Sequence, residues 1–153
     1  VLVSIQSMVL VQDPIFNEPG VERQRGTPEG QTQAALFNQC VQYKTLLHGV
    51  LEPLTNPPPH FRSVVVTHFS ARREFVLRQA RKWREEATKF WTSPPPMPQM
   101  LCASIFHENP PPLSAWDAIV SSLETELAKL PPFVPPPRVE QAPGAAAAAL
   151  PGP

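Results

Sequence analysis

The two cysteines are the side chains best suited to nucleophilic chemistry in this chain. A thiolate that accepts an acyl group must be exposed and must lie beside a hydrogen-bond donor to the oxyanion that forms. Cys40 instead keeps helical spacing with Leu36 and Leu47 on an apolar face, and Cys102 lies in an apolar run with no base beside it. The pattern therefore predicts two thiols that pack in the interior, with no nucleophile among them.

The histidines are the next candidates, as metal ligands or as general bases. They do not show the spacing of a zinc site, and no Cys-x-x-Cys pair accompanies them. The chain also has no Gly-rich phosphate loop. We therefore expect no metal site and no cofactor. The four histidines are His48, His60, His68 and His107.

The composition excludes several classes of partner and predicts a compartment. Thirteen basic and 13 acidic residues balance among 153, so the overall charge does not favour nucleic acid or membrane. The apolar run at residues 1–11 is too short to span a bilayer and lacks the features of a signal peptide. Two cysteines without a secretory signal indicate a reducing compartment, which predicts a cytoplasmic or nuclear protein.

Two sequence features keep a binding role open. Seven of the basic residues lie from Arg72 to Lys89, and a basic helix face of this kind is one way to bind RNA or lipid. The interleaved glutamates favour an ordinary solvated face instead. The chain also contains 22 prolines, many in short runs that adaptor domains read as polyproline II. Residues 135–138 are the best candidate for binding such a domain, because an arginine follows their prolines. The simpler interpretation is that the proline runs are rigid spacers between helices.

The elements that position these residues are predicted to be helices. Apolar residues recur at steps of three and four in several segments. The predicted helices are 1–11, 32–51, 61–69, 71–91 and 115–130. Pro53 is expected to end the second, Ser70 to cap the fourth, and Ser114 with Asp117 to form a capping box for the last. Residues 15–31 are predicted to be loop, and residues 97–108 are left unassigned.

The predicted loop carries the most specific motif in the chain. Residues 4–8 read Ser-Ile-Gln-Ser-Met, residues 16–20 read Phe-Asn-Glu-Pro-Gly, and residues 25–30 read Arg-Gly-Thr-Pro-Glu-Gly. This succession resembles the segment after the active-site cysteine in E2 ubiquitin-conjugating (UBC) domains, above all those of the large E2/E3-hybrid type. The resemblance extends to about residue 54, and more weakly to 69. Ile15 and Val21 depart from it, since the hybrid branch has tyrosine at both positions.

The resemblance implies a function and a set of site residues. E2 enzymes carry ubiquitin as a cysteine thioester, received from an E1 enzyme and passed to a lysine, often with an E3 ligase. The resemblance places that cysteine upstream of Val1, so no catalytic nucleophile is expected within the chain. It also implies that Asn17 and Glu18 lie in the loop that orients the incoming lysine, where an amide or carboxylate can hold the amine and accept its proton. The implied contacts with donor ubiquitin are Val3 and Ser7.

We therefore expect an all-α fragment, the C-terminal helical part of an α/β UBC fold without its sheet and active-site segment. The expected division is a UBC-like part at 1–69, a helical extension at 70–130 and a disordered Pro/Ala-rich tail at 131–153. The expected partners are ubiquitin and, in a full-length parent, E1 and E3 enzymes, with no nucleic acid and no membrane. The alternative is a non-catalytic helical module that binds ubiquitin, an E3 or an adaptor.

Overall fold

The computed structural model describes residues 11–93 and 110–135, and all regular elements in these two ranges are helical. The prediction of an all-α chain is confirmed for them. The predicted helix at 1–11, the unassigned segment 97–108 and the tail beyond residue 135 lie outside the described residues, apart from Val11. The elements are η1 (Pro14–Asn17), η2 (Glu22–Gln24), α2 (Pro28–Lys44), η3 (Thr45–Leu51), α3 (Glu52–Thr55), η4 (Pro59–Phe61), α4 (Arg62–Thr92) and α6 (Leu113–Ala128).

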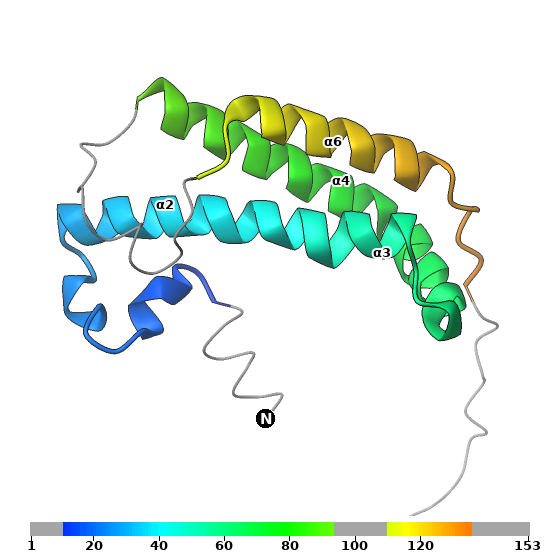
Figure 1. The fold of residues 1–153 in the computed structure, drawn as a ribbon, viewed down its shortest axis with the longest axis horizontal. Coiled ribbons are helices and arrows are strands. Elements are labelled where there is room, and N and C mark those ends of the chain that lie inside the picture. Colours follow the sequence, from blue (N-terminus) through cyan, green and yellow to red (C-terminus); the bar gives the residue numbers. More distant parts are fainter. Residues whose placement is uncertain (1–10, 94–109, 136–153) are drawn as a thin grey trace, which may run out of the picture.

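Three long helical segments lie side by side (Figure 1). The first is a continuous rod made of α2, η3 and α3; α4 returns antiparallel to this rod, and α6 runs antiparallel to α4. The two short 3-10 helices η1 and η2 pack under the start of α2. The loop with the specific motif is thus held at one end of the helical layer.

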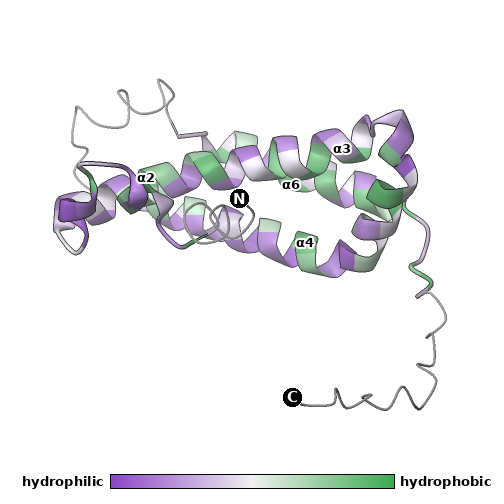
Figure 2. Cartoon of the chain, turned by 90° about the horizontal axis from the view of Figure 1, so that it is seen from below, coloured by the Kyte–Doolittle hydropathy of each residue, from purple (hydrophilic) through white to green (hydrophobic). Residues whose placement is uncertain are grey.

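The apolar faces of the long helices meet in one core. Figure 2 shows hydrophobic segments on each of them, alternating with hydrophilic ones. α6 contributes Trp116, Ile119, Leu123 and Leu127, all buried, at the spacing that the sequence predicted. Ala80 and Ala87 of α4 are fully buried opposite them, and their small side chains allow the two helices to approach closely.

The two predicted helices at 61–69 and 71–91 are one helix, α4, and the prediction that Ser70 caps a new helix is wrong. Neither glycine nor proline occurs between Phe61 and Trp91, so nothing in the sequence ends the helix. Phe69 is buried in the common core, and this packing outweighs the local capping preference of serine. The helix runs through the expected boundary between 69 and 70, and the division of the chain at that point stays a prediction.

The second predicted helix also has wrong limits. It begins at Pro28 rather than Thr32, because Thr27 caps it and proline fits the first helical turn. After Lys44 the helix continues as the seven-residue π-helical segment η3 and then as α3, so it passes Pro53 and ends at Thr55. Pro53 lies in the first turn of α3, directly after the π-helical segment, so the hydrogen-bond pattern of the rod changes where the N–H group is missing.

The capping box predicted for the last helix is also wrong. Pro112 is the N-cap of α6, and its carbonyl accepts hydrogen bonds from the N–H groups of Ala115 and Trp116, at 3.0 and 3.3 Å. The carboxylate of Asp117 instead pairs with Arg84 of α4 at 2.8 Å. Asp117 therefore makes a charge-assisted contact between two helices and not the predicted capping contact within its own helix.

Most of the basic residues of α4 are exposed, as the sequence suggested, but some of them also contact α6 or the residues directly after it. Arg81 pairs with Glu124 at 2.7 Å, as Arg84 does with Asp117. The guanidinium of Arg73 donates to the carbonyl of Leu130 at 2.5 Å. These contacts fix the register of α4 against α6, although each exposed pair contributes only about 0–1 kcal/mol.

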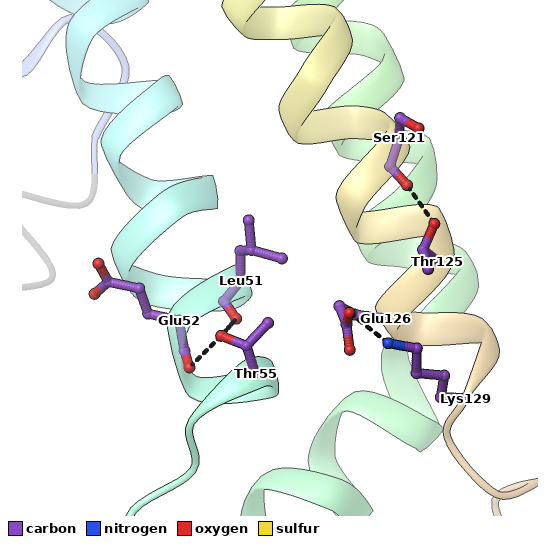
Figure 3. A network of polar contacts seen from close by, with 7 residues as sticks. All are labelled: Leu51, Glu52, Thr55, Ser121, Thr125, Glu126 and Lys129. Atoms are coloured by element: carbon purple, nitrogen blue, oxygen red, sulfur yellow. Dashed lines mark hydrogen bonds and ion pairs between the residues drawn. The ribbon is translucent and has the colours of Figure 1, made fainter.

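Polar groups near the adjacent ends of α3 and α6 are satisfied within their own helices (Figure 3). Thr55 donates to the carbonyls of Leu51 and Glu52, and Thr125 donates to that of Ser121 at 3.0 Å. Lys129 pairs with Glu126 at 2.6 Å. Apolar side chains, among them those of Leu51, Leu54 and Leu127, therefore make the contact between this end of the rod and α6.

Candidate functional site

The loop that carries Asn17 and Glu18 is anchored by a small core of its own. Ile15 and Phe16, the two residues before Asn17, are both buried. They pack with Val21 and with Ala34 of α2, and Phe37 adds partial cover. Ile15 therefore fulfils an apolar anchoring role although it replaces the aromatic residue of the family pattern.

Asn17 and Glu18 lie side by side in sequence at the end of η1, and both are exposed. Their backbone is held by hydrogen bonds within the turn, since the N–H of Glu18 donates to the carbonyl of Ile15 at 3.1 Å. The two polar side chains are thus presented to solvent from a turn whose preceding residues are fixed in the interior. This arrangement suits a site that must hold a reacting group without much rearrangement.

Two further contacts hold the ends of this turn. Asp13 adopts a left-handed conformation, with φ of 53°, and its carboxylate accepts a hydrogen bond of 2.7 Å from the side-chain amide of Asn38. Gly20 also has positive φ, at 91°, and its N–H donates to the Glu22 carboxylate at 2.5 Å. A residue with a β-carbon would be strained at position 20, so the glycine of the motif is needed for the shape of the turn.

The second half of the loop is tied to the first turn of α2. The Thr27 hydroxyl accepts from the N–H of Gly30 at 3.0 Å and donates to the carbonyl of Gln24 at 2.9 Å. The guanidinium of Arg25 lies over the ring of Phe16, 5.0 Å from its centre. The Arg-Gly-Thr part of the motif therefore closes the loop back onto the Phe-Asn-Glu-Pro-Gly part.

Gly30 allows the closest approach in this region. A β-carbon at this position would lie 2.0 Å from the Gln24 carbonyl oxygen, a separation that no real contact reaches. Gly30 is buried at the third position of α2, so only glycine lets the loop backbone lie directly on the helix start. From the sequence, Gly30 could be recognised only as part of the motif. No local pattern predicts its close contact with the Gln24 carbonyl.

The structure describes two of the predicted site residues, Asn17 and Glu18. Asn17 and Glu18 share one exposed turn, whereas Val3, Ser7 and Cys102 lie outside the described residues. Cys40 is buried, with 7% of its surface exposed, and it packs in α2 as the sequence predicted. The contribution of Asp13, whose carboxylate ties this turn to Asn38 of α2, was not predicted from the sequence.

Metal and membrane chemistry receive no support from the described residues. Within 11–93 and 110–135, no three His, Cys, Asp or Glu side chains gather as ligands for an ion. None of the helices in these ranges combines the length and apolar character required to cross a bilayer.

The chain was compared with known proteins. No family model matches it. It is 42% identical over 83 residues to "Probable ubiquitin-conjugating enzyme protein 17" of Caenorhabditis elegans, and 41% identical over 83 residues to human "Dual E2 ubiquitin-conjugating enzyme/E3 ubiquitin-protein ligase BIRC6". It is 32% identical over 84 residues to "Probable ubiquitin-conjugating enzyme E2 24" of Arabidopsis thaliana.

These matches cover about half of the chain and a small part of each relative. They span 54%, 54% and 55% of the chain but 11%, 2% and 9% of the three relatives, in the same order. The predicted resemblance is nevertheless confirmed, because relatives from animals and a plant share it. Over slightly more than half of its length, this chain is similar to E2 ubiquitin-conjugating enzymes, including one of the dual E2/E3 type.

Proposed function

We propose that the chain forms the C-terminal helical part of an E2-type domain that transfers ubiquitin from a cysteine thioester to a lysine. The observation that carries this proposal is the 41–42% identity to ubiquitin-conjugating enzymes, together with an exposed Asn17–Glu18 turn on a firmly anchored loop. The proposed partners are ubiquitin and the E1 and E3 enzymes of such a system. The proposed compartment is the cytoplasm or nucleus.

The proposed role of Asn17 and Glu18 is to hold the attacking amine. A lysine is protonated at neutral pH and must lose a proton before its nitrogen can attack a thioester. A carboxylate or amide within hydrogen-bond reach aligns the amine, and a carboxylate can accept its proton. The buried Ile15 and Phe16 support this role because they fix the backbone from which the two side chains project.

Donor ubiquitin is proposed to contact Val3 and Ser7. This assignment comes from the resemblance alone, because both residues lie outside the described ranges. The nucleophilic cysteine is proposed to belong to the part of the domain that precedes Val1.

The isolated chain is expected to form no ubiquitin thioester. Cys40 is buried in α2, where neither ubiquitin nor the E1 enzyme can reach its sulfur, and Cys102 lacks a neighbouring base in the sequence. The measurement is incubation with E1, ATP and ubiquitin, followed by electrophoresis with and without reducing agent. A thiol-labile adduct that disappears in the Cys40→Ser or Cys102→Ser variant would contradict the expectation.

A chimera tests whether the chain completes an E2 domain. The part of the human dual E2/E3 relative that precedes the region of similarity, including its active-site cysteine, is joined to Val1. We expect the chimera to form a thiol-labile ubiquitin adduct and to transfer ubiquitin to free lysine. A folded chimera that loads ubiquitin but never transfers it would favour the alternative, a helical module that only binds.

A further inference from the structure

One side-chain hydrogen bond ties the loop of Asn17 and Glu18 to the long helix α2. The carboxylate of Asp13, directly before η1, accepts this bond from the side-chain amide of Asn38 at 2.7 Å. Both partners are half-buried, so the bond is partly shielded from water. It crosses from the loop to a helix 25 residues further along the chain.

The bond lies beside the small apolar core under the same loop. Ile15 and Phe16 of η1 pack with Ala34 of α2. Ala34 and Asn38 are four positions apart, so they lie on one face of α2, about one turn from each other. Apolar packing has no preferred direction, whereas a hydrogen bond weakens steeply when its angle changes. The polar contact therefore determines how the loop is oriented about the apolar one.

The backbone of η1 carries this orientation to Asn17 and Glu18. Asp13 is the N-cap of η1, and Asn17 ends the element about 8 Å further along its axis. The carbonyl of Asp13 accepts from the N–H of Phe16 at 3.2 Å. The next turn closes in the same way, from the N–H of Glu18 to the carbonyl of Ile15 at 3.1 Å. A rotation of η1 at Asp13 would therefore move Asn17 and Glu18 with it.

The backbone of Asp13 shows that this position needs its carboxylate. Its φ is 53°, a left-handed conformation that is uncommon for a residue with a β-carbon. At the other two positions of the described ranges with positive φ, the chain has glycine, Gly20 and Gly26. Glycine would also suit the backbone at position 13, so the aspartate is explained by what its side chain does. Residues held in such conformations concentrate at functional sites.

We propose that Asp13 and Asn38 are positioning residues for the transfer of ubiquitin to lysine. Their hydrogen bond holds the turn of Asn17 and Glu18 at the angle from which it meets the incoming amine, and neither of the two touches the substrate. A misplacement of about 1 Å can slow an enzymatic reaction about 100-fold. The role of this pair rests on the proposed function, because it concerns the same transfer step.

Hydrogen exchange of the full chain tests whether the bond holds the loop. Asp13→Gly removes the carboxylate and suits the left-handed backbone, and Asn38→Ala removes the amide from within a helix. The two variants differ in charge but remove the same bond. We expect both to exchange the amide hydrogens of residues 14–25 about tenfold faster or more, with residues 113–128 unaltered. Unaltered exchange of the loop in both folded variants would overturn the proposal.

The loaded chimera tests the effect of the bond on transfer. We expect both variants to load ubiquitin normally and to discharge it to free lysine about tenfold more slowly or more. Discharge to hydroxylamine is expected to be unaltered, because hydroxylamine is uncharged at neutral pH and needs no group to accept its proton before attack. A general loss of structure at the active site would slow both reactions.

Two further variants separate positioning from stability. Asp13→Asn combined with Asn38→Asp exchanges donor and acceptor, and we expect it to restore discharge to lysine to within about threefold of the unaltered rate. Ile119→Val loosens the core at α6, far along the chain from the loop, and is expected to leave the rates with lysine and hydroxylamine unaltered.

Slower discharge to hydroxylamine in the single variants, or an exchanged pair no faster with lysine than they are, would overturn the proposal. Normal discharge to lysine by both single variants, in a chimera that Asn17→Ala with Glu18→Ala slows, would overturn it and leave the proposed function intact. A chimera that loads ubiquitin but never discharges it would overturn both.

Discussion

Replacing Trp116 with alanine is expected to lower the free energy of unfolding by about 3–5 kcal/mol. The indole is completely buried where α6 meets the other helices, and its ring makes an edge-on contact with Tyr43, with 5.5 Å between ring centres. Truncation removes a large apolar surface and leaves a cavity that Leu46 and Leu123, also in this core, can fill only in part. Urea denaturation followed by circular dichroism measures the loss.

Two matched variants separate the cavity from other effects. Trp116→Phe keeps an aromatic ring and removes an indole N–H that has no hydrogen-bond acceptor among the described residues. We expect this variant to lose less than about 1.5 kcal/mol. Phe133→Ala alters an exposed aromatic residue and is expected to change stability by no more than about 0.5 kcal/mol. A Trp116→Ala variant as stable as Phe133→Ala would show that α6 is not packed as described.

Replacing Gly30 with alanine is the second change expected to have a large effect, at about 1–3 kcal/mol or more. The added β-carbon would lie 2.0 Å from the Gln24 carbonyl oxygen, so either the loop or the first turn of α2 must move. For comparison, Thr27→Ala adds no atoms and removes the cap together with the hydrogen bond to the Gln24 carbonyl, and it is expected to cost about 1 kcal/mol. Thermal melting gives the stability. Tryptic cleavage after Arg23 or Arg25 reports on the loop, and we expect it to become faster.

Gly49 provides the matched control for Gly30. A β-carbon there would meet only the Thr45 side chain, at an ordinary 3.9 Å, and the residue lies inside a helical segment. Gly49→Ala is therefore expected to be neutral or to stabilise the chain by up to about 1 kcal/mol. If Gly30→Ala were as stable as Gly49→Ala, the close contact of loop and helix would be refuted.

Helical periodicity predicted the buried face of α6 correctly, because burial there follows spacing along one element. It did not predict the limits of the helices. Ser70 looks like a cap in isolation, but the burial of Phe69 carries α4 through it. Asp117 looks like half of a capping box, but Arg84 on another helix takes its carboxylate. Both errors have the same origin, since tertiary contacts outweigh local preferences of less than about 1–2 kcal/mol.

The candidate site was predictable only through its motif. The succession Phe-Asn-Glu-Pro-Gly led to Asn17 and Glu18 by resemblance, while their exposure and the burial of Ile15 and Phe16 emerged from the structure. The link from Asp13 to Asn38 joins residues 25 positions apart, and no local pattern reveals such a contact.

The rate of ubiquitin discharge from the loaded chimera tests the proposed function most directly. A single-turnover chase with free lysine measures the transfer step separately from thioester formation. We expect the double variant Asn17→Ala, Glu18→Ala to load ubiquitin normally but to discharge it about 100-fold more slowly, because the amine loses its orienting and proton-accepting groups. Glu29→Gln, an exposed change in the first turn of α2, should leave both rates unaltered. Discharge of the double variant at the unaltered rate would contradict the proposed role of this loop.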